Sequence, residues 1–248
     1  MGCLAPYQPI NTLKAIADDL WIVDGPEITM AFPWFKALGA PFTTRMTVIR
    51  LPDGGLWIHS PTPITDSLAN ELNGIGRVNA LVAPNRLHYS WIPDWTKRYP
   101  SAATYAAPGM DAKAAEHCGG FTETLGATAP SSWQGAFDQV LVPGDFMTEA
   151  VFFHRASRTL ILTDLIENFE PRRISCLPLR WLCRASGCCD PDGKMPFDLR
   201  YTFRRHRDAM RDAVRRMIAL EPERIILAHG RWYPGRAVDE LKRAFRWL

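Results

Sequence analysis

Short hydrophobic runs bounded by turn residues dominate the first half of the chain. Residues 20–25 form one such run, and residues 44–61 contain two of them around a Pro-Asp-Gly-Gly sequence, which is typical of a β-hairpin. Apolar residues at helical spacing predict a helix over residues 64–75, with Thr62 as its N-cap. A further buried run follows at residues 78–84, and this strand–helix–strand unit predicts a partly parallel sheet.

The second half of the chain repeats this mixture of strands and helices. Residues 149–164 predict another hairpin, and residues 165–200 an irregular segment rich in Pro, Cys and Arg. We expect an Arg-studded helix over residues 203–220, a final buried strand over 223–230 and an amphipathic helix over 237–248. No linker or repeat divides these elements, so we expect residues 1–248 to form a single domain.

The composition is that of a folded, water-soluble chain. With 47% hydrophobic and 22% charged residues, the 248-residue chain is too apolar for intrinsic disorder, and its 20 Pro and 17 Gly exclude a long coiled coil. No apolar run approaches the ~18–20 residues of a membrane span, and no signal-peptide pattern opens the sequence. We therefore expect a cytoplasmic protein without a membrane partner, in which the six cysteines stay reduced.

The net charge of +3 hides an uneven distribution. Residues 172–216 carry 12 Lys and Arg against 5 Asp and Glu, whereas the rest of the chain is acidic. Arg–Asp pairs at helical spacing would neutralise part of this charge on a solvated helix. The alternative is an anionic small-molecule substrate or ligand, or less favourably a nucleic acid, bound by Arg204, Arg205 and Arg207, because guanidinium groups contact phosphate and carboxylate with two hydrogen bonds.

Three hydrophobic runs end in a residue that can bind a metal ion. His88 follows one predicted strand, and Asp164 and His229 follow two others, while a fourth run ends in His59. Functional sites gather at strand ends, where loops meet over a rigid sheet. Two His and one Asp are a ligand set for Zn²⁺, or for Fe or Mn, although each residue taken singly could be a hydrogen-bonded His or Asp of the core.

The order of these pieces resembles the metallo-β-lactamase-like superfamily, and specifically a bacterial branch of uncharacterised members whose motifs are degenerate. The resemblance covers nearly the whole chain and is carried by VIRLPDGGLWIHSP, LVAPNRLHYSWIPDW, VFFHRASRTLILTDLIEN and ILAHG. It implies the α/β class and a four-layer αββα sandwich of two mixed sheets, with a metal site at one edge of the sheets.

The resemblance also implies roles for individual residues. Where the superfamily has its H-x-H-x-D-H motif, this chain has residues 85–90, and His88 alone remains as a ligand. Asp164 matches the Asp that bridges two metals in the superfamily, and His229 matches the last His ligand. His59 stands where the superfamily has an Asp behind the ligands, and we expect Asn85 to lie behind them as well.

A further His ligand of the superfamily is missing, because residues 144–149 contain none. Asp145 or Glu149 could take its place or accept a proton. Three good ligands are too few for two metal ions, so we expect at most one divalent metal, Zn or Fe/Mn, at which water would hydrolyse an ester, a lactone or a phosphoester.

Two other functions stay open. A metal-free protein would have kept the fold and lost the site, and Tyr89, Trp91, Trp95 and Trp34 could then line an aromatic pocket for a small apolar ligand. The third hypothesis, a factor that processes nucleic acids or phosphate ligands, is supported by the arginines alone. A homo-oligomer is compatible with the sequence.

The remaining cluster of candidate ligands consists of cysteines. Cys176, Cys183, Cys188 and Cys189 lie within one short segment, but their spacing fits no common zinc-ribbon pattern. They are either a structural zinc site or a set of partly buried thiols.

Overall fold

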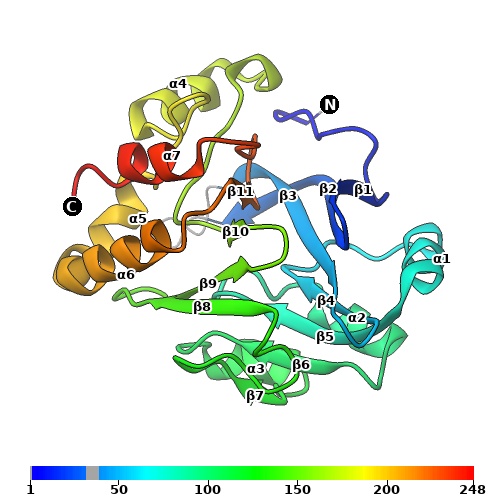
Figure 1. Ribbon diagram of the computed structural model, residues 1–248. Coiled ribbons are helices and arrows are strands. Elements are labelled where there is room, and N and C mark those ends of the chain that lie inside the picture. Colours follow the sequence, from blue (N-terminus) through cyan, green and yellow to red (C-terminus); the bar gives the residue numbers. More distant parts are fainter. Residues whose placement is uncertain (1, 32–38) are drawn as a thin grey trace.

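Two β-sheets face each other in the computed structural model, which describes residues 2–31 and 39–248 (Figure 1). The larger sheet has seven strands in the order β1-β2-β3-β4-β5-β6-β7, and the smaller has four in the order β11-β10-β9-β8. The strands of the larger sheet are β1 (Lys14–Ala17), β2 (Leu20–Ala31), β3 (Gly39–Arg50), β4 (Gly55–His59), β5 (Arg77–Ala83), β6 (Ala103–Ala106) and β7 (Glu123–Thr124). Those of the smaller sheet are β8 (Phe137–Val142), β9 (Glu149–His154), β10 (Thr159–Leu162) and β11 (Arg224–Leu227).

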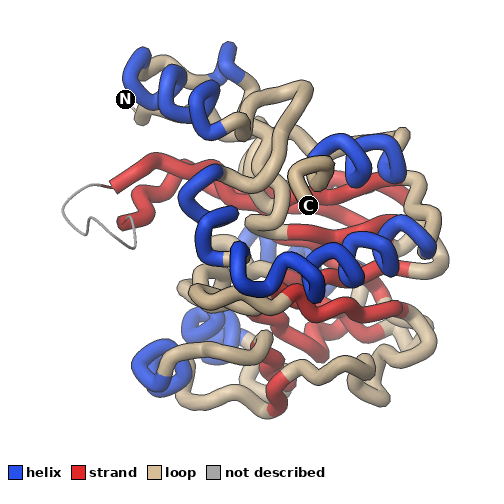
Figure 2. The backbone as a smooth tube through the Cα atoms, turned by 90° about the vertical axis from the view of Figure 1, so that its left-hand side faces the viewer, coloured by secondary structure: helices blue, strands red, loops and turns tan. Residues whose placement is uncertain are grey.

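Helices cover the outer faces of both sheets (Figures 1 and 2). The larger sheet packs against α1 (Asp66–Ile75) and α2 (Ile92–Arg98), and the smaller one against α6 (Arg207–Ala219) and α7 (Ala237–Ala244). The other helices are α3 (Ala112–His117), α4 (Leu177–Ser186), α5 (Phe197–Thr202) and the 3₁₀ turns η1 (Pro171–Arg173) and η2 (Arg204–His206). The αββα sandwich is therefore confirmed. Within the described residues, no helix is both long and apolar enough to cross a membrane.

Side chains alternate along the strands, so a single strand contributes both to the core between the sheets and to the core under the outer helices. In β4, Trp57 points between the two sheets, whereas Leu56 and Ile58 point to the opposite face and pack with α1 and α2. This follows from the two-residue period of a strand. A strand buried on both faces needs a continuous hydrophobic run, which explains why the sequence of β4 lacks the polar alternation of a half-exposed strand.

Most of the predicted strands are confirmed. Both hairpins form, β4 and β5 pair in parallel around α1, and β11 supplies the final strand. The helix over residues 64–75 begins later than expected, because its N-cap is Thr65 and not Thr62. The Thr65 side chain accepts a hydrogen bond from the Leu68 N–H, as an N-cap does.

Three predictions in the second half are wrong in part. The segment 165–200 is not irregular throughout, because it contains η1, α4 and the start of α5. The helix expected over 203–220 begins instead as the 3₁₀ turn η2 and continues as α6, and Phe203 just before η2 is fully buried with its ring beside Gly144. The closing helix ends at Ala244, four residues before the end of the chain.

The expectation of six reduced cysteines is also wrong. Cys3 and Cys176 form a disulfide with Cα atoms 5.2 Å apart, which ties the start of the chain to the beginning of α4. Cys183 and Cys188 are buried in a small apolar cluster with Leu4, and Cys189 packs at its edge. Cys176 is taken up by the disulfide and no three cysteines of the described residues gather as metal ligands, so the structure favours free thiols for Cys183, Cys188 and Cys189.

Candidate metal centre

Three side chains converge at the edge of the two sheets. The Nε2 atom of His88 lies 3.2 Å from Asp164 Oδ2, and the Nε2 atom of His229 lies 3.2 Å from Asp164 Oδ1. The two Nε2 atoms are 3.2 Å apart. In residues 2–31 and 39–248, this is the only group of three His, Cys, Asp or Glu side chains whose ligand atoms all lie within 4.8 Å of one another.

Strand register explains why Asp164 and His229 meet. β10 and β11 are parallel neighbours, and Leu162 pairs with Leu227 at their carboxyl ends. Asp164 and His229 each follow their paired leucine by two residues, so the two side chains leave the sheet at the same height. His88 comes from the other sheet, in the turn that follows β5.

The Nδ1 atom of each imidazole already has a hydrogen-bond partner. His229 Nδ1 donates to the carbonyl oxygen of Thr43 at 2.7 Å, and His88 Nδ1 pairs with the hydroxyl of Ser60 at 2.6 Å. Both rings therefore turn Nε2 toward Asp164. Metal-binding histidines are held in this way in proteins, so the donor set fits one divalent metal. The sequence does not reveal these partners, because Thr43 lies in β3 and Ser60 just after β4, both far from the histidines along the chain.

Asn85 and Glu149 support Asp164 from behind. The Asn85 amide donates to Asp164 Oδ2 at 2.6 Å and lies 3.3 Å from Glu149 Oε2. The two Glu149 oxygens accept the backbone N–H groups of Thr163 and Asp164, each at 2.8 Å. Glu149 thus holds the backbone that carries Asp164 and is not in the group of three.

Burial and charge act in opposite directions on these carboxyl groups. Burial, reinforced by the charge of Asp164, raises the pKa of Glu149 to about 7, although backbone hydrogen bonds oppose the shift. Burial alone would raise the pKa of Asp164 as well, but the charges and hydrogen bonds of His88 and His229 outweigh it and hold that pKa well below its usual range. Asp164 is therefore the permanent anion of the group.

His59 lies between the sheets and not beside Asp164. Its ring stacks on Trp57 at 5.4 Å and meets Phe152 edge-on at 5.6 Å, while its Nε2 has no hydrogen-bond partner. Burial and the nearby charge of His88 lower the pKa of His59 to about 3. The side chain is thus a neutral core residue behind the site.

The remaining predicted site residues lie elsewhere. Asp145 accepts a hydrogen bond from His206 Nε2 at 3.0 Å near the surface. The Arg204 guanidinium stacks on the Tyr201 ring, and Arg207 donates to the Trp247 carbonyl oxygen. Arg205 is exposed. None of these contacts reaches the three converging residues.

The aromatic residues do not form the expected pocket. Trp95 is fully buried, and its indole N–H donates to the Thr62 carbonyl oxygen at 2.7 Å, so it belongs to the core under α2. Tyr89 and Trp91 pack against the same core. Trp34 lies outside the described residues.

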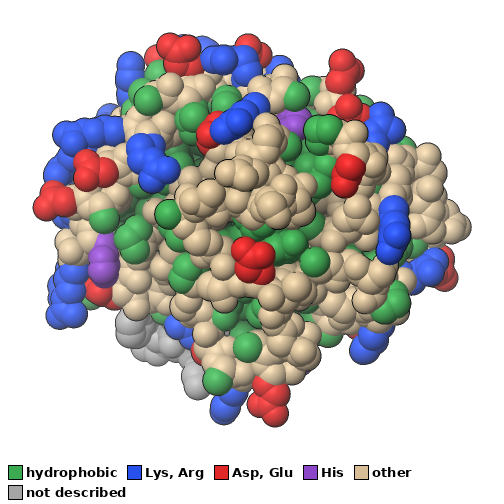
Figure 3. Space-filling model, turned by 60° about the horizontal axis from the view of Figure 1, so that its bottom comes forward, with side chains coloured by type: hydrophobic (Ala, Val, Ile, Leu, Met, Phe, Trp, Pro, Cys, Tyr) green, Lys and Arg blue, Asp and Glu red, His purple; other side chains and the backbone are tan. Residues whose placement is uncertain are grey.

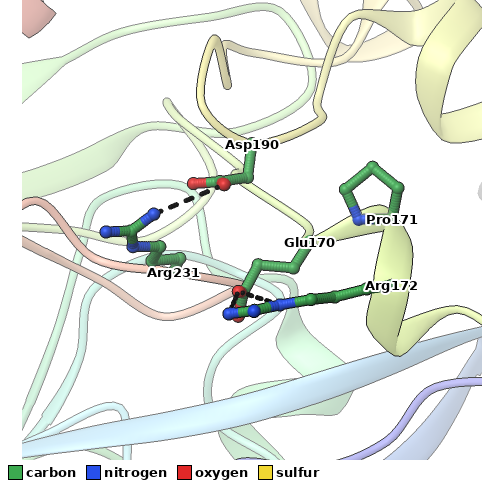
Figure 4. Close-up of a pocket in the computed structure, with 5 residues that line it drawn as sticks. All are labelled: Glu170, Pro171, Arg172, Asp190 and Arg231. Carbon is green, nitrogen blue, oxygen red and sulfur yellow. Dashed lines mark hydrogen bonds and ion pairs between the residues drawn. The ribbon is translucent and has the colours of Figure 1, made fainter.

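A charged cleft of about 320 Å³ adjoins the segment that carries His229 (Figure 4). Its lining residues are Glu170, Pro171, Arg172, Asp190 and Arg231. Arg231 is two residues beyond His229 and pairs loosely with Asp190 at 3.5 Å, while Arg172 binds Glu170. Both arginine side chains are more than half exposed, so their remaining N–H groups are accessible from the cleft.

Solved structures with the same architecture are metallo-β-lactamases. DIM-1 metallo-β-lactamase exposed to ceftazidime superposes with a TM-score of 0.60 at 14% identity, covering 95% of this chain and 96% of that one. A metallo-β-lactamase from Pontibacter korlensis gives 0.59 at 11% identity over 95% and 98% of the two chains. FIM-1 from Pseudomonas aeruginosa in its mono-zinc form gives 0.55 at 13% identity over 95% and 93%.

These likenesses establish the metallo-β-lactamase fold. Residues 37–182 match the family described as Domain of unknown function (DUF4336), and the chain belongs to that family. A comparison with curated proteins finds no match.

Proposed function

We propose that this protein is a metal-dependent hydrolase with a mononuclear site formed by His88, Asp164 and His229. The observation that carries the proposal is their convergence, with the Nδ1 atom of both imidazoles already bound elsewhere. Zinc suits two imidazoles and one carboxylate, and Fe or Mn is the alternative. A divalent ion held there would activate a water molecule near neutral pH and polarise the bond to be cleaved.

The chain's own residues would orient and neutralise this site. Asp164 supplies the negative charge, and Asn85 fixes its carboxylate. Glu149, expected above to accept a proton, uses both oxygens to hold the backbone around Asp164, so we assign it to positioning. Asp145, paired with His206, has no contact with the three residues, and we assign it no step in the reaction.

The substrate would be a small ester, lactone or phosphoester with an anionic group. The charged cleft lined by Arg231, two residues beyond His229, supports this proposal, because Arg231 and Arg172 leave guanidinium N–H groups open to solvent there. Arg231 and Arg172 are therefore the first candidates to contact the anionic group of the substrate. The arginines of residues 204–207, expected earlier in this role, lie against aromatic side chains or in solvent.

Metal analysis of protein purified without chelator tests the proposal. We expect close to one equivalent of Zn, Fe or Mn, and a rise in melting temperature on adding metal, because a ligand that binds only the folded state stabilises it. His229→Ala should abolish both effects, whereas the matched control His206→Ala should keep them. Less than about 0.2 equivalents, with no thermal gain, contradicts a metal site.

The rival function is a metal-free binding protein. It is favoured by one observation: Asp164 is already satisfied by the Asn85 amide and the two histidines, so the group is complete as a hydrogen-bond network. The same metal measurement separates the two functions. A role in processing nucleic acids rests only on the basic segment and stands third.

Two expectations about the setting stay predictions. A bacterial source is what the family resemblance implies. A cytoplasmic location agrees with the sequence, but the Cys3–Cys176 disulfide argues for an oxidising compartment.

A further inference from the structure

The large apolar side chains exposed to water are concentrated in two helices. Leu177, Trp181 and Leu182 of α4 are 62%, 68% and 43% exposed, and Phe197 and Tyr201 of α5 are 55% and 59% exposed. Elsewhere in the described part of the chain no large hydrophobic side chain is exposed to this degree. The face shown in Figure 3 carries hydrophobic groups in small patches, with backbone and other side chains between them. We call these five residues the α4–α5 surface.

Both helices turn one side inward and leave the other uncovered. In α4, Leu179 and Cys183 pack into the cluster around Leu4, whereas Leu177 and Trp181 lie one turn apart on the exposed side. In α5, Phe197 and Tyr201 have the same spacing. Both helices lie on the left of Figure 1, the side that faces the viewer in Figure 2.

Positive charge accompanies this apolar surface. The Arg184 guanidinium lies over the Trp181 ring at 5.8 Å, and the Arg204 guanidinium over the Tyr201 ring at 4.0 Å. Arg184, Arg204 and Arg205 are exposed and form no ion pair with any acid of the described residues. Unlike Arg211 and Arg215 of α6, which pair with Asp208 and Asp212, these three arginines keep their charge available to a partner.

We propose that the α4–α5 surface docks the protein on an anionic lipid surface. Trp, Tyr and Leu side chains beside unpaired arginines are the composition of interfacial helices, in which the apolar groups enter the boundary of the acyl chains and the cations meet lipid phosphates. Such docking needs no helix that spans the membrane, but it departs from the expectation, drawn from the sequence, of a protein without a membrane partner. It goes beyond the proposed hydrolysis and does not depend on the metal.

Charge disfavours a second copy of the chain on this surface, and the aliphatic side chains disfavour a nucleic acid. A second copy packed through the same surface would bring the unpaired arginines of both chains together, which is unfavourable in a symmetric interface. A nucleic acid would match the charge but would leave the aliphatic side chains of Leu177 and Leu182 without a partner, since bases stack on rings. An anionic bilayer satisfies both the apolar groups and the charges.

Co-sedimentation of the full-length protein with vesicles tests this proposal. We expect binding to vesicles of phosphatidylcholine mixed with phosphatidylglycerol, weakened by added salt, and little binding to phosphatidylcholine alone. Trp181→Ser should weaken binding about tenfold through lost apolar burial, and Arg184→Gln about fivefold through lost charge. The control Arg215→Gln removes an exposed arginine of α6 that pairs with Asp212, and should change nothing.

The variants remain informative if one of them folds poorly. Trp181 and Arg184 are exposed, so the variants Trp181→Ser and Arg184→Gln should melt at the same temperature as the unmodified protein. The double variant Arg184→Gln, Arg204→Gln tests the contribution of charge to vesicle binding a second time. Absence of binding to the anionic vesicles, or equal binding to phosphatidylcholine alone, overturns the proposal. So does concentration-dependent dimerisation that Trp181→Ser abolishes, or binding to an RNA homopolymer in place of vesicles.

Discussion

A single buried histidine shows how much the interior of this sandwich shapes side-chain chemistry. His59 lies among the rings of Trp57 and Phe152, where its charged form has no hydrogen-bond partner for Nε2. Burial lowers its pKa from 6.5 to about 3, so the folded protein keeps it neutral at pH values where the unfolded chain protonates it. Its contribution to stability is fully present above pH 6.5 and is lost as the pH falls toward about 3.

The consequence is a stability loss on acidification that depends on His59. Below pH 6.5 the unmodified protein should lose about 1.4 kcal/mol of unfolding free energy per pH unit through this group. His59→Phe keeps the ring and removes the titration, so its unfolding free energy should fall less steeply. Urea unfolding at pH 7 and pH 4.5 measures the difference. The exposed control His117→Gln should behave like the unmodified protein, and equal slopes for all three proteins would refute the idea.

The Asn85 amide donates a hydrogen bond to each of two neighbouring buried carboxyl groups. Its amide lies between Asp164 and Glu149, so Asn85→Ala removes the shared donor and leaves both groups less satisfied. We expect a loss of about 1–3 kcal/mol in unfolding free energy and a 10- to about 100-fold weaker metal affinity. Urea unfolding and zinc titration by calorimetry measure the two effects. The exposed Asn73→Ala is the control, and a zinc affinity unchanged by Asn85→Ala would contradict the supporting role.

At the scale of elements, β3 holds the loop that carries His229. Arg45 on this strand donates to the carbonyl oxygens of Leu227 and Gly230, at 2.8 and 2.7 Å, and its guanidinium also pairs with the buried Asp24 at 2.7 Å. Gly230 has φ +82°, and a side chain there would collide with the Asn168 carbonyl group, so this turn needs glycine. The His229 loop is therefore fixed from two sides.

Two arginines on β3 allow a buried ion pair to be compared with an exposed one: Arg45 is buried and Arg50 is exposed. Arg45→Met leaves Asp24 buried with Lys14 as its remaining partner and frees two carbonyl oxygens, so we expect a loss of about 3–5 kcal/mol in unfolding free energy. Arg50→Met removes an exposed pair with Asp19 and should cost less than about 1 kcal/mol. Chemical denaturation of both variants measures the difference, and similar losses would rule out the proposed role of Arg45.

The elements that were predictable are those whose signal is local. A hairpin turn or a helical stripe can be read from consecutive residues, and so can a ligand at the end of a hydrophobic run, as with Asp164 and His229. The change from η2 to α6 within residues 203–220 could not, because the burial of Phe203 beside Gly144 depends on residues far apart in the sequence. Thr43, Ser60 and Arg45 act on residues far away in sequence, so no local pattern marks them.

At the scale of the whole molecule, long-range contacts join the ends of the chain to its middle. The core between the sheets contains residues from Leu20 to Ile226, so both halves contribute to it. We accordingly expect a single cooperative unfolding transition, and the single-domain assignment stays a prediction until that is measured. The disulfide between Cys3 and Cys176 closes a loop with a sequence separation of 173 residues.

Closing so long a loop restricts the unfolded chain strongly. The chain-entropy relation gives about 5 kcal/mol for a loop of this length, so Cys3→Ser should lower the unfolding free energy by up to that amount. The control Cys189→Ser removes a partly buried free thiol and should cost about 1 kcal/mol or less. Urea unfolding without reductant measures both variants.

Thiol titration of the denatured, unreduced protein gives an independent check, because the structure leaves Cys118, Cys183, Cys188 and Cys189 free. Four reactive thiols should be counted in the unmodified protein and five in Cys3→Ser, since breaking the disulfide releases Cys176. Six thiols in protein purified under air would mean that the two sulfurs do not bond. The chain would then have to hold its N-terminal segment through the remaining contacts, such as the hydrogen bond from Ala5 N–H to the Arg173 carbonyl oxygen.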